Sequence, residues 1–91
     1  MEFRASHILV KERSLAEQLL KKIKGGANFA ALARDWSTCP SKSKGGDLGW
    51  FKEGEMVPAF EREVKRMGIG SISKVVSTQF GFHIIKKTGS R

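Results

Sequence analysis

Residues 45–61 read GGDLGWFKEGEMVPAFE and combine a strand, a turn and the start of a helix. The segment 48–51 is short and apolar and predicts a strand. Glu-Gly-Glu at 53–55 predicts a turn. Pro58 suits the first turn of a helix, because its missing N–H has no helical partner at that position. The apolar stripe of this predicted helix is Phe60, Val64 and Met67.

One strand and two helices are predicted upstream of this run. Residues 5–10 are apolar and rich in β-branched side chains, which predicts a strand. Ser14 and Glu17 are spaced as a capping box for a first helix, and Asn28 is placed to cap a second. The apolar stripes of the two helices are Leu15, Leu19, Leu20 and Ile23, then Phe29, Leu32, Ala33 and Trp36.

The remaining segments complete the predicted order of elements. Residues 37–46 form a polar loop rich in serine and lysine, and residues 72–76 and 82–87 predict two further strands. The order is therefore β-α-α-β-α-β-β. It predicts an α+β fold with a four-stranded, mostly antiparallel sheet surrounded by helices. A chain of 91 residues has room for one domain, which we place at residues 1–91.

Composition limits the cellular setting. The chain is 40% hydrophobic and 29% charged, an ordinary balance for a globular protein. Its single cysteine, Cys39, excludes an intramolecular disulfide, so the fold does not depend on an oxidising compartment. Residues 1–4 are not followed by an apolar run long enough for a secretory signal, and no stretch reaches membrane-spanning length. We expect a cytoplasmic location, although a domain of a larger exported protein would have the same composition.

The net charge of +8 points to anionic partners. The lysines and arginines are scattered, and no block of five or six like charges is present, which argues against a disordered basic tail. We expect weak, non-specific binding of nucleic acid or acidic protein through the basic surface. A dedicated nucleic-acid-binding module is an alternative function that the charge supports.

Two histidines and the cysteine are the candidates for chemistry. His7 and His83 lie in predicted strands near the two ends of the chain; a lone strand histidine is more often structural. Terminal strands of small α+β domains often pair centrally, so the two rings could share a hydrogen bond. Cys39 is either a small buried hydrophobe or a nucleophile with a histidine base. A metal site of these three residues has no closely spaced ligand pair, and we expect no metal or cofactor.

Apolar residues around the central run suggest a pocket. Core packing is the default for Leu48 and Phe60. Met56 lies before the helix, where its flexible thioether could line an open apolar pocket. The glycines at 45–49 are not a phosphate loop, because the Gly-Lys-Ser/Thr ending and the following helix are missing. The residues alone therefore predict a basic α+β domain with a His/Cys site and an apolar pocket.

Three blocks of this sequence resemble the parvulin family of prolyl isomerases. Residues 6–10, SHILV, resemble its first strand, residues 45–61 its central signature, and residues 78–86, TQFGFHIIK, its last strand. The blocks occur in the family's order and cover nearly the whole chain. The loop at 11–14 is short, whereas the phosphorylation-directed branch carries a longer basic loop there. This chain therefore resembles the short, non-phospho-specific branch.

The resemblance implies a non-covalent peptidyl-prolyl isomerase that acts on proline-containing polypeptides as a folding helper. It implies no cofactor, and we expect a monomer. A substrate-binding chaperone without catalysis is a further alternative. The implied catalytic residues are His7, Cys39, Thr78 and His83, and the implied substrate-binding residues are Leu48, Met56, Phe60, Gln79 and Phe80.

Overall fold

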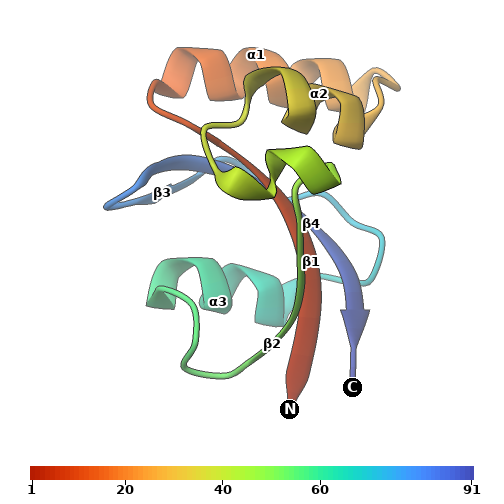
Figure 1. Cartoon of the computed structure of the whole chain (residues 1–91), viewed down its shortest axis with the longest axis vertical. Coiled ribbons are helices and arrows are strands. Elements are labelled where there is room, and N and C mark those ends of the chain that lie inside the picture. The colour runs from red at the N-terminus through yellow and green to blue at the C-terminus, as the bar shows by residue number, and fades with distance from the viewer.

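Four strands and three α-helices form the framework, which the computed structural model describes over residues 1–91 (Figure 1). The sheet order is β2-β1-β4-β3, and every neighbouring pair is antiparallel. The predicted α+β class, the element order and the central pairing of the terminal strands are confirmed. The elements are β1 Glu2–Val10, α1 Arg13–Lys24, α2 Phe29–Trp36, the 3-10 helix η1 Pro40–Lys44, β2 Asp47–Lys52, α3 Pro58–Arg66, β3 Val76–Thr78 and β4 Gly81–Ser90.

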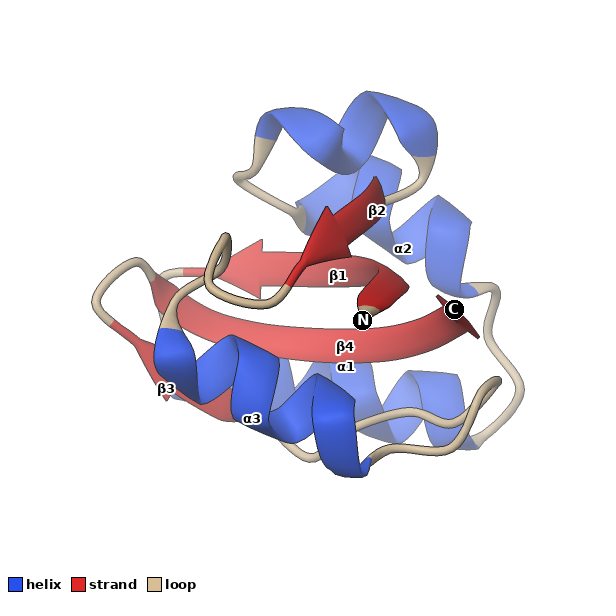
Figure 2. Cartoon of the chain, turned by 90° about the horizontal axis from the view of Figure 1, so that it is seen from below, coloured by secondary structure: helices blue, strands red, loops and turns tan.

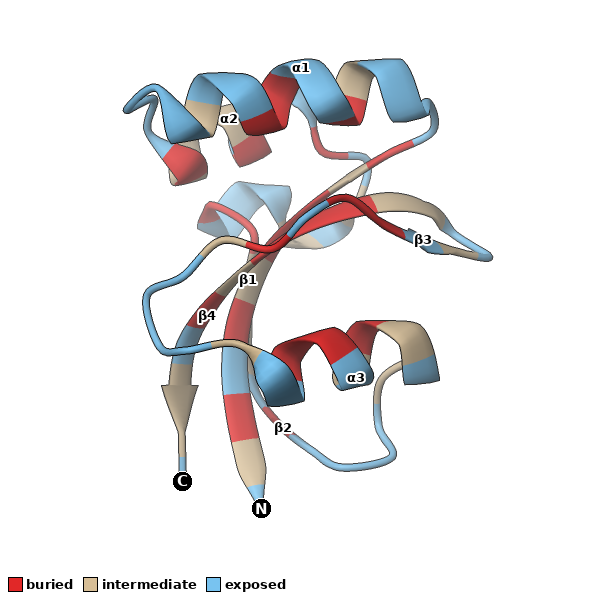
Figure 3. Ribbon diagram, turned by 180° about the vertical axis from the view of Figure 1, so that it is seen from behind, coloured by how far each residue is buried: buried red, intermediate tan, exposed pale blue.

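The helices cover the two faces of the sheet unequally. Helices α1 and α2 pack on one face and α3 on the other (Figures 1 and 2). Because side chains alternate along a strand, Ile8 and Ile84 face α1 and α2, whereas Ala5 and Ile85 face α3. The buried sides of the helices point to the sheet between them (Figure 3). None of the helices combines the length and apolar character needed to cross a membrane.

The third strand lies later in the chain than the sequence predicts. The prediction placed it at 72–76, but β3 covers Val76–Thr78, and Ile72 makes only an isolated bridge to Lys86. The reason lies at Ser73, whose Oγ accepts the Ile85 N–H at 2.9 Å in place of a main-chain carbonyl. The regular ladder is therefore interrupted at Ser73 and resumes at β3.

Two helix starts test the capping predictions. The Asn28 cap of α2 is confirmed, because its side chain accepts the Ala31 N–H at 2.8 Å. The capping box at Ser14 is wrong: Glu12 is the N-cap of α1 and makes no side-chain cap bond. The Glu12 carbonyl already accepts the Ala16 N–H at 3.1 Å, so Ser14 lies inside the first turn rather than before it.

Two further details differ from the expectations. Trp36 was predicted in the apolar stripe of α2 but is 45% exposed, because it is the last residue of that helix and projects past the core. The loop at 37–46 contains the 3-10 helix η1. After η1, Gly46 adopts a φ of 89°, and its carbonyl accepts the His7 N–H at 2.9 Å. A Cβ at Gly46 would overlap the His7 carbonyl oxygen, so this close approach requires glycine.

The first and last residues of the sheet pair with each other. The Glu2 N–H donates to the Arg91 carbonyl at 2.7 Å, and the Arg91 N–H donates to the Glu2 carbonyl at 2.9 Å. An ion pair of 2.7 Å joins Arg91 Nε to the Glu2 carboxylate. Both ends of the chain therefore lie at the same end of the β1/β4 ladder (Figure 1).

Candidate active site

The two histidines meet on the face of the sheet that α3 covers. His7 is 5% exposed and His83 is 4% exposed, and their Nδ1 atoms lie 3.0 Å apart. Thr78 Oγ1 lies 2.7 Å from His83 Nε2, and it also accepts the Phe80 N–H at 3.2 Å. The strand pairing of β1 with β4 thus creates a hydrogen-bonded row of Thr78, His83 and His7. The shared bond expected from the sequence is confirmed.

Burial keeps both imidazole rings neutral. It lowers the pKa of His83 to about 4, and burial together with the neighbouring His83 ring lowers the pKa of His7 to about 4. At pH 7 each ring then carries one N–H, and one Nδ1–H donates to the other Nδ1. The Nε2 atom of His7 is buried without a hydrogen-bond partner. The pair therefore offers polar atoms but no positive charge.

Phe60 of α3 closes the site from above the rings. It is 2% exposed, and its ring stands edge-on to both imidazoles, with centroid distances of 5.6 Å to His7 and 5.5 Å to His83. The helix stripe that the sequence predicts as core packing therefore also forms a wall of the site. Phe60 is both a core residue and a site residue.

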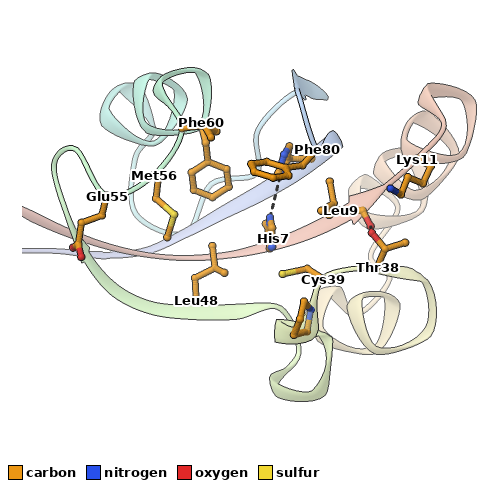
Figure 4. Close-up of a pocket in the computed structure, with 13 residues that line it drawn as sticks. His7, Leu9, Lys11, Thr38, Cys39, Leu48, Glu55, Met56, Phe60 and Phe80 are labelled. Atoms are coloured by element: carbon orange, nitrogen blue, oxygen red, sulfur yellow. Dashed lines mark hydrogen bonds between the residues drawn. The ribbon is translucent and has the colours of Figure 1, made fainter.

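A cavity of about 600 Å³ opens beside the histidine pair (Figure 4). Figure 4 shows side chains from β1, the 38–40 loop, β2 and the start of α3 converging on it. The site residues expected from the sequence that line it are His7, Cys39, Leu48, Met56, Phe60, Phe80 and His83. The sequence thus indicated most of the lining, whereas the roles of these residues in catalysis and binding stay predictions.

Two residues expected at the site lie outside the lining. Thr78 sits behind His83, to which it is hydrogen-bonded, so it would act through that ring rather than on a bound molecule. Gln79 lies in the turn between β3 and β4 and is exposed. Its role as a substrate contact stays a prediction that this geometry does not favour.

Cys39 is held in place by a buried serine that the sequence analysis missed. Ser37 is 2% exposed, and its Oγ accepts the Leu9 N–H at 3.1 Å and the Cys39 N–H at 3.3 Å. The Thr38 N–H donates to the Leu9 carbonyl at 2.8 Å. These bonds fasten the 37–39 segment to the end of β1, so that the half-buried Cys39 faces the cavity.

Further lining residues were also missed, although some had a signal. Leu9 lies two positions after His7 in the same strand, so the two share a face. Glu55 and Val57 flank Met56 directly. Ser37 carried no signal, because a serine after a helix is ordinary. The missed lining residues are Leu9, Lys11, Thr38, Pro40, Glu55 and Val57.

The arrangement can bind an apolar group next to weak hydrogen-bonding atoms. Neither imidazole hydrogen-bonds the Cys39 sulfur, and neutral rings provide no positive charge that would stabilise a thiolate. A nucleophilic cysteine needs such a base or charge. The site therefore has the chemistry of a binding pocket with a polar wall rather than that of a Cys/His hydrolase.

Known proteins resemble this chain in both sequence and fold. A profile of the PPIC-type PPIASE domain matches residues 2–91. The foldase protein PrsA of Bacillus subtilis (strain 168) is 50% identical over 91 residues, which cover 99% of this chain and 31% of that protein. This chain thus spans less than a third of the length of that relative.

Solved structures agree. A crystal structure of the peptidylprolyl isomerase PrsA from Bacillus anthracis matches with a TM-score of 0.98 at 46% identity, covering 99% of this chain and 42% of that one. The solution structure of NmPin, the parvulin of Nitrosopumilus maritimus, matches with a TM-score of 0.85 at 38% identity, covering 97% and 96% of the two chains. Because the profile, the relatives and the folds agree over nearly the whole sequence, this chain belongs to the family of PPIC-type peptidyl-prolyl isomerase domains, the parvulins.

Proposed function

We propose that this chain accelerates rotation about X-Pro peptide bonds in flexible polypeptides and does so without a covalent intermediate. The observation that carries this proposal is the apolar cavity beside a neutral histidine pair. Leu48, Met56 and Phe60 form one end of it (Figure 4), and an aromatic ring, a thioether and a branched chain suit the flat face of a proline ring.

Rotation about an X-Pro peptide bond breaks no covalent bond. The barrier to rotation about a peptide bond is about 18–20 kcal/mol, and uncatalysed X-Pro exchange takes roughly tens to hundreds of seconds. Only contacts that are stronger in the twisted state than in the planar one lower this barrier. The proline ring would stay fixed on the apolar wall while the preceding carbonyl swings past His7, Cys39 and His83.

The polar wall favours the twisted amide. A planar amide is the more dipolar state, with more charge on its carbonyl oxygen and a flatter nitrogen. In the twisted state the oxygen loses charge and the nitrogen becomes pyramidal. Neutral imidazoles beside a largely apolar surface solvate the planar form less well than water does, which narrows the gap between the two states.

An isomerase assay tests the proposal. A proline-containing tetrapeptide such as Ala-Leu-Pro-Phe is mixed with a catalytic amount of the chain, and cis/trans exchange is measured by NMR exchange spectroscopy. We expect faster exchange, and mass spectrometry during turnover should find no adduct on Cys39. Binding of the peptide without faster exchange would instead support the chaperone alternative, and a trapped acyl adduct would contradict the non-covalent mechanism.

The chain's partners follow from the pocket and the charge. We propose that it is a monomer and that it helps proline-containing polypeptides to fold; the PrsA relatives are named foldase proteins. Weak, non-specific binding of nucleic acid or acidic protein is supported by a second hollow of about 300 Å³. Its lining includes Arg62, Arg66 and Lys74 and one carboxylate, Glu63, which pairs with Arg66 at 3.6 Å. Such binding should weaken steeply as salt rises. The cytoplasmic location stays a prediction, which fractionation of producing cells would check.

A further inference from the structure

The two ends of the main cavity differ in charge. Two lining residues carry a full charge, Lys11 a positive one and Glu55 a negative one. Figure 4 places Glu55 beside Met56 at one end and Lys11 beyond Leu9 and Thr38 at the other. The residues that line the cavity are therefore acidic at one end and basic at the other.

Glu55 is the carboxylate of its turn that has no cation partner. Glu53 and Glu61 both pair with Lys65 Nζ, each at 3.6 Å. Glu55 forms no ion pair; its Oε1 accepts the Lys52 N–H, which fixes the direction of the carboxylate and leaves Oε2 without a hydrogen bond. A fixed, exposed and unpaired carboxylate at the rim of a binding cavity is suited to receive a cation from a ligand.

Lys11, at the other end of the cavity, is also a charged side chain without an ion-pair partner. Its neighbour Arg13 is already engaged, because it pairs with Glu17 at 3.7 Å and lies over the Phe82 ring at 5.3 Å. Lys11 itself has no ion pair and is exposed. The end at Lys11 thus carries a single free positive charge.

The direction of a bound peptide follows from the proposed function. If the proline ring lies on Leu48, Met56 and Phe60, the rotating carbonyl lies near Cys39. The chain before the proline then continues towards Leu9 and Lys11, and the chain after it leaves past Met56. Successive Cα atoms are about 3.8 Å apart and Glu55 directly precedes Met56 in the chain, so we take the residue directly after the proline as the one that meets Glu55.

We infer that Glu55 forms a subsite for a positively charged residue, lysine or arginine, that directly follows the proline. This inference rests on the proposed isomerase function and adds a substrate class to it. The free ammonium group of Lys11 works in the same direction, because it disfavours a positive charge before the proline. The preferred substrates are therefore Pro-Lys and Pro-Arg segments with an uncharged or acidic residue ahead of the proline.

Peptides of identical composition provide the test. Acetyl-Ala-Ala-Pro-Lys-amide and acetyl-Ala-Lys-Pro-Ala-amide differ only in the position of the charge, and acetyl-Ala-Ala-Pro-Gln-amide is the neutral reference. We expect kcat/KM for the Pro-Lys peptide to exceed the reference by about two- to fivefold, as for a partly exposed ion pair. The Lys-Pro peptide should fall below the reference, and about 0.5 M salt should reduce both differences.

Two variants assign the preference to one side chain. Glu55→Gln keeps an oxygen that accepts the Lys52 N–H and removes only the charge, so the Pro-Lys peptide should lose its advantage over the Pro-Gln peptide. Glu53→Gln, in the same turn but outside the cavity, should keep the preference. Equal rates for Pro-Lys and Pro-Gln, or a preference that survives in Glu55→Gln, would overturn the subsite and leave the isomerase function standing. If none of the three peptides is turned over, the isomerase function itself is overturned.

Discussion

The two faces of the sheet carry different kinds of interior. On the face covered by α1 and α2, buried apolar residues pack into one cluster, and Ile8 and Leu19 within it are almost fully enclosed. On the face covered by α3, two buried histidines interrupt the apolar residues, and a cavity stays open. The closed face can stabilise the fold because no substrate has to reach it. The open face can then hold polar groups that a tightly packed core would exclude.

Matched truncations on the two faces give the largest expected effect. Leu19→Ala should lower the free energy of unfolding by about 2–5 kcal/mol and leave kcat/KM of the folded fraction unchanged. Phe60→Ala should also lower stability, and it should reduce kcat/KM by roughly 30-fold or more, since an anchoring aromatic contributes about 2 kcal/mol or more to binding. Chemical denaturation and the exchange assay measure the two quantities.

The results for Leu19→Ala and Phe60→Ala decide whether the two faces differ in function. Near-UV circular dichroism establishes that each variant is folded before activity is compared. A folded Phe60→Ala variant with unchanged activity would contradict the role of Phe60 in substrate binding. A folded Leu19→Ala variant with a similar loss of activity would show that stability and activity are not separated between the two faces.

Ser37→Ala tests whether the loop that carries Cys39 depends on one buried hydroxyl. The substitution leaves the Leu9 and Cys39 N–H groups without their acceptor, so it should cost about 1–3 kcal/mol of stability and lower activity by misplacing Cys39. Ser43→Ala is the matched control, because Ser43 is exposed and bonds only Pro40. Equal stability of the two variants would contradict the positioning role.

The histidine pair gives the open face a pH dependence that the other face lacks. Both folded pKa values of about 4 lie below the ordinary value of 6.5, so the unfolded chain binds more protons between these pH values. The free energy of unfolding should therefore be fully supported above pH 6.5 and fall as pH drops towards 4. NMR titration of the ring Cε1–H signals follows each histidine, and a ring that titrates near 6.5 would contradict burial as neutral pairs.

Cys39→Ser should have the smallest effect. Serine keeps a small hydrogen-bonding group in the same place, so kcat/KM should change by no more than about threefold, which is below 1 kcal/mol. Cys39→Asp should be tolerated better than a nucleophilic sulfur would allow, because the only side-chain partner of Cys39, Ser37 Oγ, bonds its main-chain N–H and not its sulfur. Loss of activity in both folded variants would favour a nucleophilic role for the sulfur.

Local patterns predicted the elements well where a side chain and its own backbone decide the structure. Asn28 caps α2 as its sequence position suggests, and the stripe of Phe60 and Val64 is buried as its spacing predicts. The paired histidines were also predictable, because the element order places the two terminal strands together. The cavity lining followed largely from the resemblance to parvulins.

Features that depend on long-range bonds could not be predicted in the same way. The shift of β3 arises from Ser73, whose hydroxyl bonds Ile85 in a strand 12 positions away. Ser37 became a positioning residue only because the end of β1 lies next to it. In both cases a polar side chain replaces a backbone partner, and no spacing rule in the sequence marks which serine will do so.

The pairing of Glu2 with Arg91 has a mechanical consequence. A chain pulled by its two ends would load the antiparallel β1/β4 ladder from the side where both ends lie. The ladder bonds would then carry the force one after another, as in a zipper, instead of sharing it as they do in shear. Such a sheet should yield at low force, starting from Glu2 and Arg91 and reaching the strands around His7 only later. Tension applied at the ends would therefore dismantle the outer ladder before it disturbed the pocket.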